Sequence, residues 1–373
     1  MVGEFLKNKE LKKMQNVLID SFGRTIDYLR ISVTKNCNFR CLYCMPNTPE
    51  IIDERVIPLP KMLEFLKIAM DFGVRKIRIT GGEPLLRKDL SAFIAGIYDY
   101  KSGVEVALTT NAYFLAREAV NLKNAGLKRI NISLDSLNAD KIARIAQKDA
   151  LSKIMDGIFA AKDAGLKIKL NMVPLKGVNN DEIIAMLCFA VENGFLLRYI
   201  EYMSNSFASG AIRGMRSDEI LAVLKERFAT KIVKKENFGP AKLYEFVEKN
   251  GESLCKSLCE STANSESLRE STANGESLRE SQGDLAQKKG VFGIIAPHSD
   301  DFCASCNRIR LTAEGVICPC LYFEDAVDIS EAIANGDKEA MIKGLLQSIH
   351  NKPEKNQWSE NAISNRAFYH TGG

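Results

Sequence analysis

A repeated strand–loop–helix pattern between residues 28 and 203 is the feature that most restricts how this 373-residue chain can fold. Short apolar or β-branched runs alternate with amphipathic segments whose apolar residues recur every three or four positions. The runs cover residues 28–34, 76–80, 104–110, 129–135, 167–173 and 197–203. Strands that alternate with helices predict a parallel sheet, either an open doubly wound sheet or a partial barrel. Both architectures place the active site at the carboxyl ends of the strands.

Residues with functional side chains follow five of these six predicted strands. They are Thr34, Thr80 before the loop Gly81-Gly82-Glu83-Pro84, Thr109-Thr110-Asn111, Ser133 with Asp135, and Met203. A single residue of this kind is most simply a turn or a helix cap. Five strand ends that face the same edge of a sheet indicate a binding site there.

The first cysteine group, Cys37, Cys41 and Cys44, has the spacing C-x3-C-x2-C. Three thiolates on one loop can hold three irons of a 4Fe–4S cubane and leave the fourth iron open for a substrate or cofactor. Structural zinc usually takes four ligands in two pairs, which this group lacks, so zinc is the weaker alternative. The spacing therefore favours an iron–sulfur cluster.

A second cysteine group lies near the C-terminus, where Cys303 and Cys306 form C-x2-C and Cys320 follows. Three thiolates again favour a 4Fe–4S cluster with an open iron. A zinc knuckle, with His298 as a possible fourth ligand, remains the alternative. The chain has ten cysteines, and in a reducing compartment such groups indicate metal or redox chemistry rather than disulfides.

Residues 249–289 interrupt the pattern with a tandem repeat, ESLREST-ANG-ESLRESQG, after a degraded copy. Ser, Glu, Asn and Gly dominate, so the segment cannot bury enough apolar surface to offset its ordering entropy. It is predicted to be a disordered or loosely helical surface insertion. Cys255 and Cys259 lie in the degraded copy at helical i, i+4 spacing, and repeat drift explains them more simply than a metal site.

Charge and apolar content limit which binding partners and which cellular compartment are expected for this chain. A net charge of +4 is too small to indicate nucleic acid. No apolar run approaches the roughly 20 residues that span a bilayer, so no membrane partner is expected. The polar N-terminus lacks a signal-peptide core, which predicts a cytoplasmic protein. Residues 1–20 are expected to form a flexible extension, and Met14 could equally be the native start.

The first cysteine motif, with its aromatic residue before the last Cys, resembles the signature of radical S-adenosylmethionine (radical SAM) enzymes, as does the Gly81–Pro84 loop. Within that superfamily the chain resembles the MoaA family, the GTP 3′,8-cyclases of molybdenum cofactor biosynthesis. The matching segments are SFGR, LRISVT-x-x-CNFRC-x-YCMP, KIRITGGEPLLR, FC-x-x-C-x-R-x-R and the terminal Gly-Gly. The resemblance covers residues 20–247 and 290–373. One departure is Lys35-Asn36, where the family often has Asp-Arg.

The resemblance implies an α/β fold, an incomplete six-stranded (β/α) barrel of radical SAM type over residues 21–225. A C-terminal auxiliary-cluster domain, residues 226–373 with the insertion 249–289, would close the cavity. Two 4Fe–4S clusters would face each other across that cavity. The resemblance also implies a homodimer and a reducing electron donor.

Residue roles follow from the same resemblance. The SAM contacts would be Tyr43, Gly82, Ser133 and Met203; the GTP contacts Arg30, Lys76, Arg78, Thr109, Lys169, Arg308 and Arg310; and the cluster ligands Cys37, Cys41, Cys44, Cys303, Cys306 and Cys320. Family spacing favours Cys320 over Cys318. Gly372 and Gly373, with Arg308 and Arg310, would take part in catalysis.

The chemistry of these residue types agrees with the implied roles. Guanidinium groups bind phosphate oxygens bidentately, although Lys76 and Arg78 could also be solvated charges at a strand edge. Lys169 lies within an apolar strand, where an unpaired charge is costly and an anionic ligand is the natural partner.

The implied function is a radical SAM lyase that cyclises GTP in the first step of molybdenum cofactor biosynthesis. SAM would bind the open iron of the first cluster and yield a 5′-deoxyadenosyl radical that abstracts the ribose 3′ hydrogen. The second cluster would anchor guanine. The rivals are a peptide-modifying radical SAM maturase and a non-catalytic metal-binding or nucleotide-sensing protein.

Overall fold

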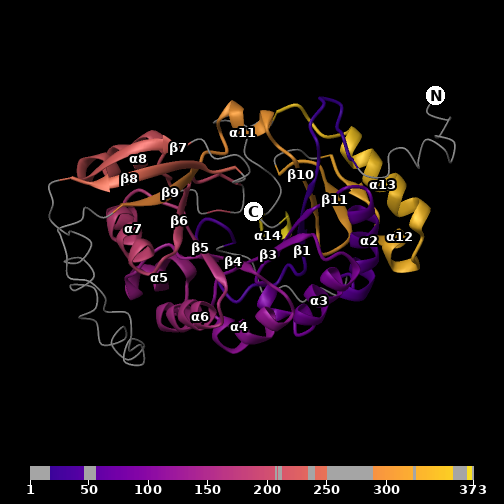
Figure 1. Cartoon of the computed structure of the whole chain (residues 1–373), viewed down its shortest axis with the longest axis horizontal. Coiled ribbons are helices and arrows are strands. Elements are labelled where there is room, and N and C mark those ends of the chain that lie inside the picture. The colour runs from indigo at the N-terminus through magenta and orange to yellow at the C-terminus, as the bar shows by residue number, and fades with distance from the viewer. Residues whose placement is uncertain are drawn as a thin grey trace.

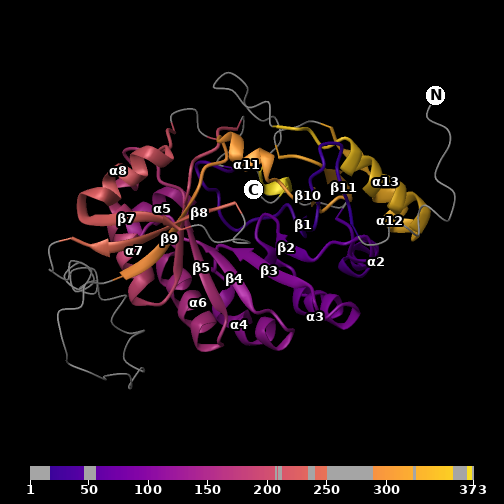
Figure 2. The same cartoon turned by 45° about the horizontal axis from the view of Figure 1, so that its top comes forward.

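The computed structural model describes residues 17–45, 56–205, 208, 212–233, 240–249, 289–321, 325–355 and 368–371. Most of the predicted insertion, the first sixteen residues, Cys255, Cys259, Gly372 and Gly373 therefore lie outside the described residues. The described part is an α/β fold in which a curved sheet forms an arc and helices cover its outer side (Figures 1 and 2).

Six consecutive parallel strands form the centre of the sheet, as the sequence predicts. They are β1 (Tyr28–Ser32), β2 (Lys76–Thr80), β3 (Glu105–Thr110), β4 (Arg129–Ser133), β5 (Lys167–Met172) and β6 (Leu196–Ile200). Neighbours in the chain are neighbours in the sheet. Alternate residues point to opposite faces of a strand, so Ile31 and Ile79 pack in the core while Arg30 and Arg78 point into the arc.

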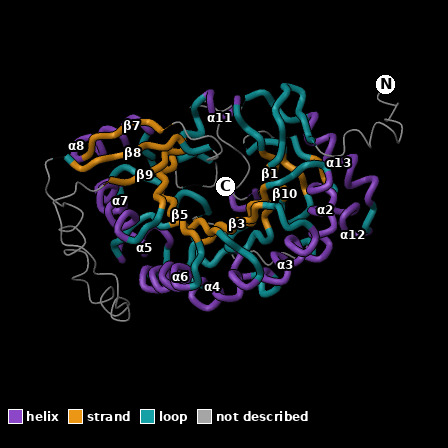
Figure 3. Tube along the Cα trace, in the orientation of Figure 1, coloured by secondary structure: helices purple, strands orange, loops and turns teal. Residues whose placement is uncertain are grey.

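The helices between the strands bury their apolar sides against the outside of the sheet (Figure 3). They are α2 (Leu59–Asp71), α3 (Leu90–Tyr100), α4 (Leu115–Asn124), α5 (Ala139–Ala146), α6 (Leu151–Asp163) and α7 (Ile183–Glu192), with the short 3-10 helices η1 (Pro84–Leu86) and η2 (Asn180–Glu182). In α2 the fully buried Met62, Phe65 and Leu66 recur at three- and four-residue spacing. Gly73, with φ of 103°, reverses the chain after this helix.

The C-terminal part of the chain extends the same sheet at both edges. After α8 (Ser217–Arg227), the strands β7 (Phe228–Val233), β8 (Lys242–Glu248) and β9 (Lys289–Ile295) join beside β6. The strands β10 (Arg308–Leu311), β11 (Val316–Cys318) and β12 (Val327–Asp328) join beside β1. Both β9–β6 and β10–β1 are parallel pairs. The predicted boundary at residue 225 therefore does not separate two sheets, because one twelve-stranded sheet runs from β12 to β7 without hydrogen-bonded closure.

Four short or C-terminal helices complete the fold: α11 (Asp300–Ala304), α12 (Ser330–Asn335), α13 (Lys338–His350) and α14 (Phe368–Thr371). Helices α12 and α13 cover α2 on the outside. Helix α14 instead lies inside the arc of strands and contacts β1 (Figures 1 and 2). None of the helices in the described ranges has the length and apolar character that crossing a membrane requires.

The segment before β1 is part of the fold, which corrects the expected flexible extension through residue 20. Leu18 is buried, and its carbonyl oxygen accepts a hydrogen bond from the Ile26 amide at 2.7 Å. The Asp20 carboxylate forms an ion pair with Arg24 at 2.6 Å. Arg24 also donates to the carbonyl oxygens of Cys303 and Pro353, at 2.9 and 2.6 Å. The SFGR segment thus ties the second cysteine group to the end of α13.

Candidate active site

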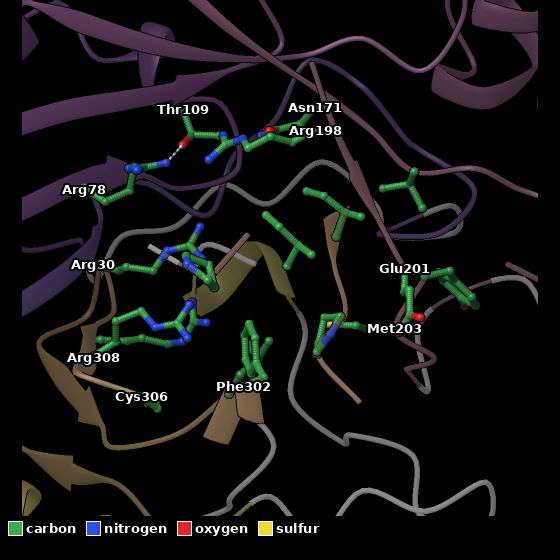
Figure 4. Close-up of a pocket in the computed structure, with 18 of the residues that line it drawn as sticks. Arg30, Arg78, Thr109, Asn171, Arg198, Glu201, Met203, Phe302, Cys306 and Arg308 are labelled. Carbon is green, nitrogen blue, oxygen red and sulfur yellow. Dashed lines mark hydrogen bonds between the residues drawn. The ribbon is translucent and has the colours of Figure 1, made fainter. Parts of the chain in front are cut away.

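A cavity inside the arc brings together most of the predicted site residues (Figure 4). Those that line it are Arg30, Tyr43, Arg78, Thr109, Ser133, Met203, Cys303, Cys306, Arg308, Arg310 and Cys320. Each wall strand contributes alternate side chains, because only one face of a parallel strand points inward. The second cysteine group therefore faces this cavity directly, whereas the first cysteine loop reaches it through Tyr43, and Cys37, Cys41 and Cys44 are not among the lining residues.

The first cysteine loop leaves β1 and packs against the end of α5. The amides of Arg40 and Leu42 donate to the carbonyl oxygens of Ala146 and Ile145, both at 3.0 Å. The Arg40 guanidinium donates to the carbonyl oxygen of Cys37 at 2.7 Å. These contacts fix the backbone of the loop, so the positions of its three thiols are set by the fold.

The thiols of this loop are held close together in a buried place. Burial, then the nearby Glu83 carboxylate, raises the pKa of Cys37 to about 11. Burial raises the pKa of Cys41 well above its usual range, and the adjacent thiols of Cys37 and Cys44 add to the effect. Neighbouring thiols of which Cys37 and Cys41 resist ionisation fit a site whose occupant supplies positive charge, as iron does.

Gly82 packs directly on this loop. A Cβ atom at Gly82 would lie 2.2 Å from the carbonyl oxygen of Asn36, so only glycine fits. The amides of Gly82 and Glu83 donate to the carbonyl oxygens of Thr34 and Asn36, both at 2.8 Å. Gly82 does not itself line the cavity.

The Glu83 carboxylate joins the ends of two neighbouring strands. It accepts hydrogen bonds from the hydroxyl of Thr110 at 2.6 Å and from the amides of Asn111 and Leu85 at 2.8 and 3.0 Å. Burial raises its pKa to about 7, although these hydrogen bonds oppose the shift. Glu83 thus holds the loop after β2 to the end of β3 through its hydrogen bonds.

Tyr43 is oriented by a buried carboxylate at the end of β4. Its hydroxyl donates to Asp135 Oδ2 at 2.7 Å, and the Val173 amide donates to Asp135 Oδ1 at 2.9 Å. Burial raises the pKa of Asp135 to about 6 and that of Tyr43 well above its usual range. Ser133 and Met203 line the same cavity. The predicted SAM residues other than Gly82 are therefore gathered in the cavity.

Five arginines line the cavity, and their like charges are held at close range. They are Arg30, Arg78, Arg198, Arg308 and Arg310, of which Figure 4 labels four. Burial, then the neighbouring guanidinium groups, lowers the pKa of Arg198 to about 9 and that of Arg310 to about 10. A bound anion would relieve the repulsion between these like charges. The cavity is therefore built for a strongly anionic ligand.

The two predicted lysines differ. In β5, burial and then Arg129 and Arg198 lower the pKa of Lys169 to about 7, although Lys169 is not among the cavity-lining residues. Lys76 forms an ion pair with Asp27 at 3.5 Å, and a third of its side chain is exposed. Lys76 also does not line the cavity. The structure therefore places neither lysine in the lining of the cavity, and Lys76 in addition has Asp27 as its ion-pair partner.

The second cysteine group faces the same cavity through Cys303, Cys306 and Cys320. Burial alone would raise the pKa of Cys306, but Arg308 and Lys352 outweigh it and lower this pKa to about 6. Cys318 is buried in β11 opposite Arg310 and does not line the cavity. The ring of His298 is turned towards the carbonyl oxygen of Tyr202, with Nε2 at 3.2 Å.

The donor sets suit cubane clusters better than single ions. Within the described ranges no three His, Cys, Asp or Glu side chains converge so as to hold one metal ion. In a cubane each thiolate binds a different iron, so such convergence is not needed. Each group also offers three cysteines, which leaves one iron without a protein ligand.

The structure adds residues that the sequence did not single out as site residues. Tyr28, Asn171, Arg198 and Glu201 line the cavity, and Arg198 donates to the Asn131 amide oxygen at 2.8 Å. One oxygen of the buried Glu201 accepts from the Ser217 amide at 2.6 Å, and the other has no partner among the described residues. Alternation along β1 and β5 is the signal that would have revealed Tyr28 and Asn171, because they share a strand face with the predicted site residues Arg30 and Lys169.

Comparisons with known proteins agree with this geometry. A family model described as "Radical SAM superfamily" matches residues 31–190, and one described as "Molybdenum Cofactor Synthesis C" matches residues 253–358. The fold resembles Streptococcus suis SuiB bound to S-adenosylmethionine, with a TM-score of 0.54 and 15% identity over 94% of this chain and 71% of that chain. The fold and the first cysteine site define a radical SAM enzyme.

Relatives of much higher identity specify the family. A GTP 3′,8-cyclase of Helicobacter pylori is 47% identical over 361 residues, which are 96% of this chain and all of the relative. One of Aliarcobacter butzleri is 45% identical over 363 residues, with the same shares. The chain belongs to the GTP 3′,8-cyclase family.

Proposed function

We propose that this protein is a GTP 3′,8-cyclase, a radical SAM lyase that converts GTP to a 3′,8-cyclised GTP in the first step of molybdenum cofactor biosynthesis. The observation that carries the proposal is the cavity itself. Five arginines line it together with Tyr43 of the first cysteine loop and with Cys303, Cys306 and Cys320 of the second group. A triphosphate supplies the anionic charge that these arginines require.

The cofactor end of the cavity is the loop after β1. Cys37, Cys41 and Cys44 would hold a 4Fe–4S cluster, and Tyr43, Gly82, Ser133 and Met203 would hold SAM. When bound, this pair supplies a 5′-deoxyadenosyl radical. Asp135 fixes the Tyr43 ring against that site through the 2.7 Å hydrogen bond.

The substrate end is the arginine group. Arg30, Arg78, Arg308 and Arg310 would bind the triphosphate, with Arg198 as an additional cation and Thr109 held by Arg78 at 3.5 Å. A bound triphosphate would raise the pKa of Lys169, so that its side chain becomes protonated and adds a further positive charge. Lys76 is left out, because Asp27 already satisfies its ammonium group.

Cys303, Cys306 and Cys320 would hold a second 4Fe–4S cluster whose open iron is available to the guanine base. Gly372 and Gly373 would complete the substrate site. The burial of Thr371, the residue before them, supports this assignment. The proposal also includes a one-electron donor and a homodimer.

Product analysis tests the proposed function. The reconstituted full-length protein is incubated anaerobically with GTP, SAM and dithionite, and the nucleotides are separated and weighed by mass spectrometry. The expected result is an isomer of GTP with a new bond, formed together with 5′-deoxyadenosine, and absent without SAM. Cleavage of SAM without any change in GTP would refute the cyclase while keeping the radical SAM assignment. No cleavage of SAM would favour a binding protein.

A further inference from the structure

Lys352 is a buried lysine at the second cysteine group that none of the roles above explains. It follows α13, and only 3% of it is exposed. Its ammonium group donates to the carbonyl oxygens of Arg308 and Pro319, both at 2.9 Å, and lies 3.4 Å from the Cys306 sulfur. An ammonium group has three N–H donors, so each donor has one acceptor.

The charge of Lys352 points to the cysteines as its electrostatic partner. Burying an ammonium group is costly unless an anion compensates it. Within the described ranges no Asp or Glu forms an ion pair with Lys352. The Cys306 sulfur is the acceptor among the three that carries a negative charge when it binds a metal.

The three acceptors also come from two separate chain segments. Cys306 and Arg308 belong to the C-x2-C segment that leads into β10, whereas Pro319 precedes Cys320. Lys352 therefore links the segments that carry the second and third thiols. The next residue, Pro353, is bound by Arg24, which also holds the carbonyl oxygen of Cys303. Lys352 and, through Arg24, Pro353 thus link the chain segments that carry the three cysteines of the second group.

We infer that Lys352 is a positioning residue of the second cysteine site, which fixes the spacing of Cys306 and Cys320 and raises the reduction potential of a 4Fe–4S cluster bound there. This inference rests on the second cluster of the proposed function. Reduction adds negative charge to a cluster, and a hydrogen-bonded cation beside a ligand sulfur stabilises that added charge. Removal of the cation makes the midpoint potential more negative.

The test uses the full-length chain with Cys37, Cys41 and Cys44 replaced by Ala, so that any cluster formed belongs to the second group. In this background, Lys352→Met removes donors and charge, Lys352→Gln keeps two donors without charge, and Lys343→Met removes an exposed lysine of α13 as a control. Each protein is reconstituted anaerobically, and its iron content, its midpoint potential by EPR-monitored titration and its rate of iron loss to a chelator are measured.

Lys352→Met should shift the midpoint potential to more negative values and speed iron loss about 10- to 100-fold, the usual effect of losing an outer partner of a metal ligand. Lys352→Gln should shift the potential in the same direction, and Lys343→Met should match the parent. A parent potential and parent iron loss in Lys352→Met would overturn the inference. If Lys352→Met fails to assemble a cluster, an unshifted potential in Lys352→Gln overturns it. Absence of iron from the parent itself refutes the proposed second cluster instead.

Discussion

Arg310 Nη1 donates a hydrogen bond to the carbonyl oxygen of Thr371 at 3.1 Å. This contact joins an arginine that lines the cavity to the end of α14, which lies inside the arc of strands. Thr371 is fully buried. Two residues before its last residue, the chain is therefore bound to an arginine that lines the cavity.

Deletion of Gly372 and Gly373 should abolish the cyclised product while both clusters assemble. Thr371 directs the tail to Arg310, and glycine lets a backbone approach a crowded site without a Cβ atom. Product mass spectrometry and iron content are the measurements. Addition of two further glycines after Gly373 serves as a control for chain length. Normal product from the shortened protein would contradict the catalytic role of the tail.

Cys41→Ser should yield no 5′-deoxyadenosine after anaerobic reconstitution. Cys41 lies between the other two thiols of its group in sequence, and a cubane with one of three protein ligands missing does not hold SAM in place. Chromatography of the nucleoside products checks this. Cys318→Ser, which changes a buried cysteine away from the cavity, should cleave SAM normally. Cleavage of SAM at the wild-type rate by Cys41→Ser would refute the assignment of Cys41 as a ligand of the first cluster.

Cys320→Ala should lose about half of the iron and all GTP turnover, because one of two clusters fails to assemble. Cys318→Ala should keep both clusters. Cys320 lines the cavity, whereas Cys318 is buried opposite Arg310 in the β10–β11 pair. Iron analysis of the two variants side by side decides the point, and the reverse result would assign Cys318 as the ligand.

GTP affinity should fall as the pH rises from 6 to 8. In the empty site the pKa of Lys169 is lowered to about 7, so Lys169 is mostly charged at pH 6 and mostly neutral at pH 8. A bound triphosphate favours the charged form, so binding at pH 8 must take up a proton. The Kd should rise about tenfold over this range, since one pKa unit corresponds to a factor of ten.

Calorimetry of GTP binding in buffers of different ionisation enthalpy measures both the Kd and the proton uptake. Lys169→Met isolates the contribution of this lysine, because the γ-phosphate titrates equally in both proteins. The variant should bind GTP weakly and show no proton uptake from residue 169. Equal pH dependence in the two proteins would remove Lys169 from the binding site.

Replacement of residues 252–287 by a short Gly/Ser linker should leave turnover unchanged. Strands β8 and β9 are antiparallel neighbours, and Val247 pairs with Lys289, so the ends that the linker must join are already adjacent. Each halving of a loop lowers its closure entropy by about 0.6 kcal/mol, so the Tm should stay the same or rise slightly. A large loss of soluble protein would show that the segment contributes to the fold.

The sequence predicted the six central strands well, because each is an apolar run bounded by Gly or Asn and followed by a clear helical period. It missed how the C-terminal strands join them. Tyr28 pairs with Arg308, which is far away in the sequence, and a local sequence pattern does not predict which distant strand pairs with which. Strand β10 consists of Arg308–Leu311, where alternating arginines indicate a ligand more strongly than a strand.

The structure gathers around one cavity many of the residues that motif spacing singles out, and it adds residues that no motif reveals. Arg198 was missed because it lies in the middle of a strand that is buried on both faces, so its direction was not evident. Lys76 shares a strand face with Arg78 but lies at the start of β2, where it forms an ion pair with Asp27 and does not line the cavity. Lys352 was missed because its partners are more than thirty residues away in the chain.

The parallel pairing of β1 with β10 has a consequence for the distance between the two cysteine groups. The first group follows the carboxyl end of β1, whereas Cys303 and Cys306 of the second group precede the amino end of β10, its direct neighbour. Cys320 follows the carboxyl end of β11, which is antiparallel to β10. The two cysteine groups are therefore separated by roughly one strand length, which for the five residues of β1 is about 16 Å. A slip of one residue in this ladder would change that separation by about 3.3 Å and turn Arg30 or Arg310 out of the cavity. The distance between the two cysteine groups thus depends on the backbone hydrogen bonds between β1 and β10 rather than on any side chain.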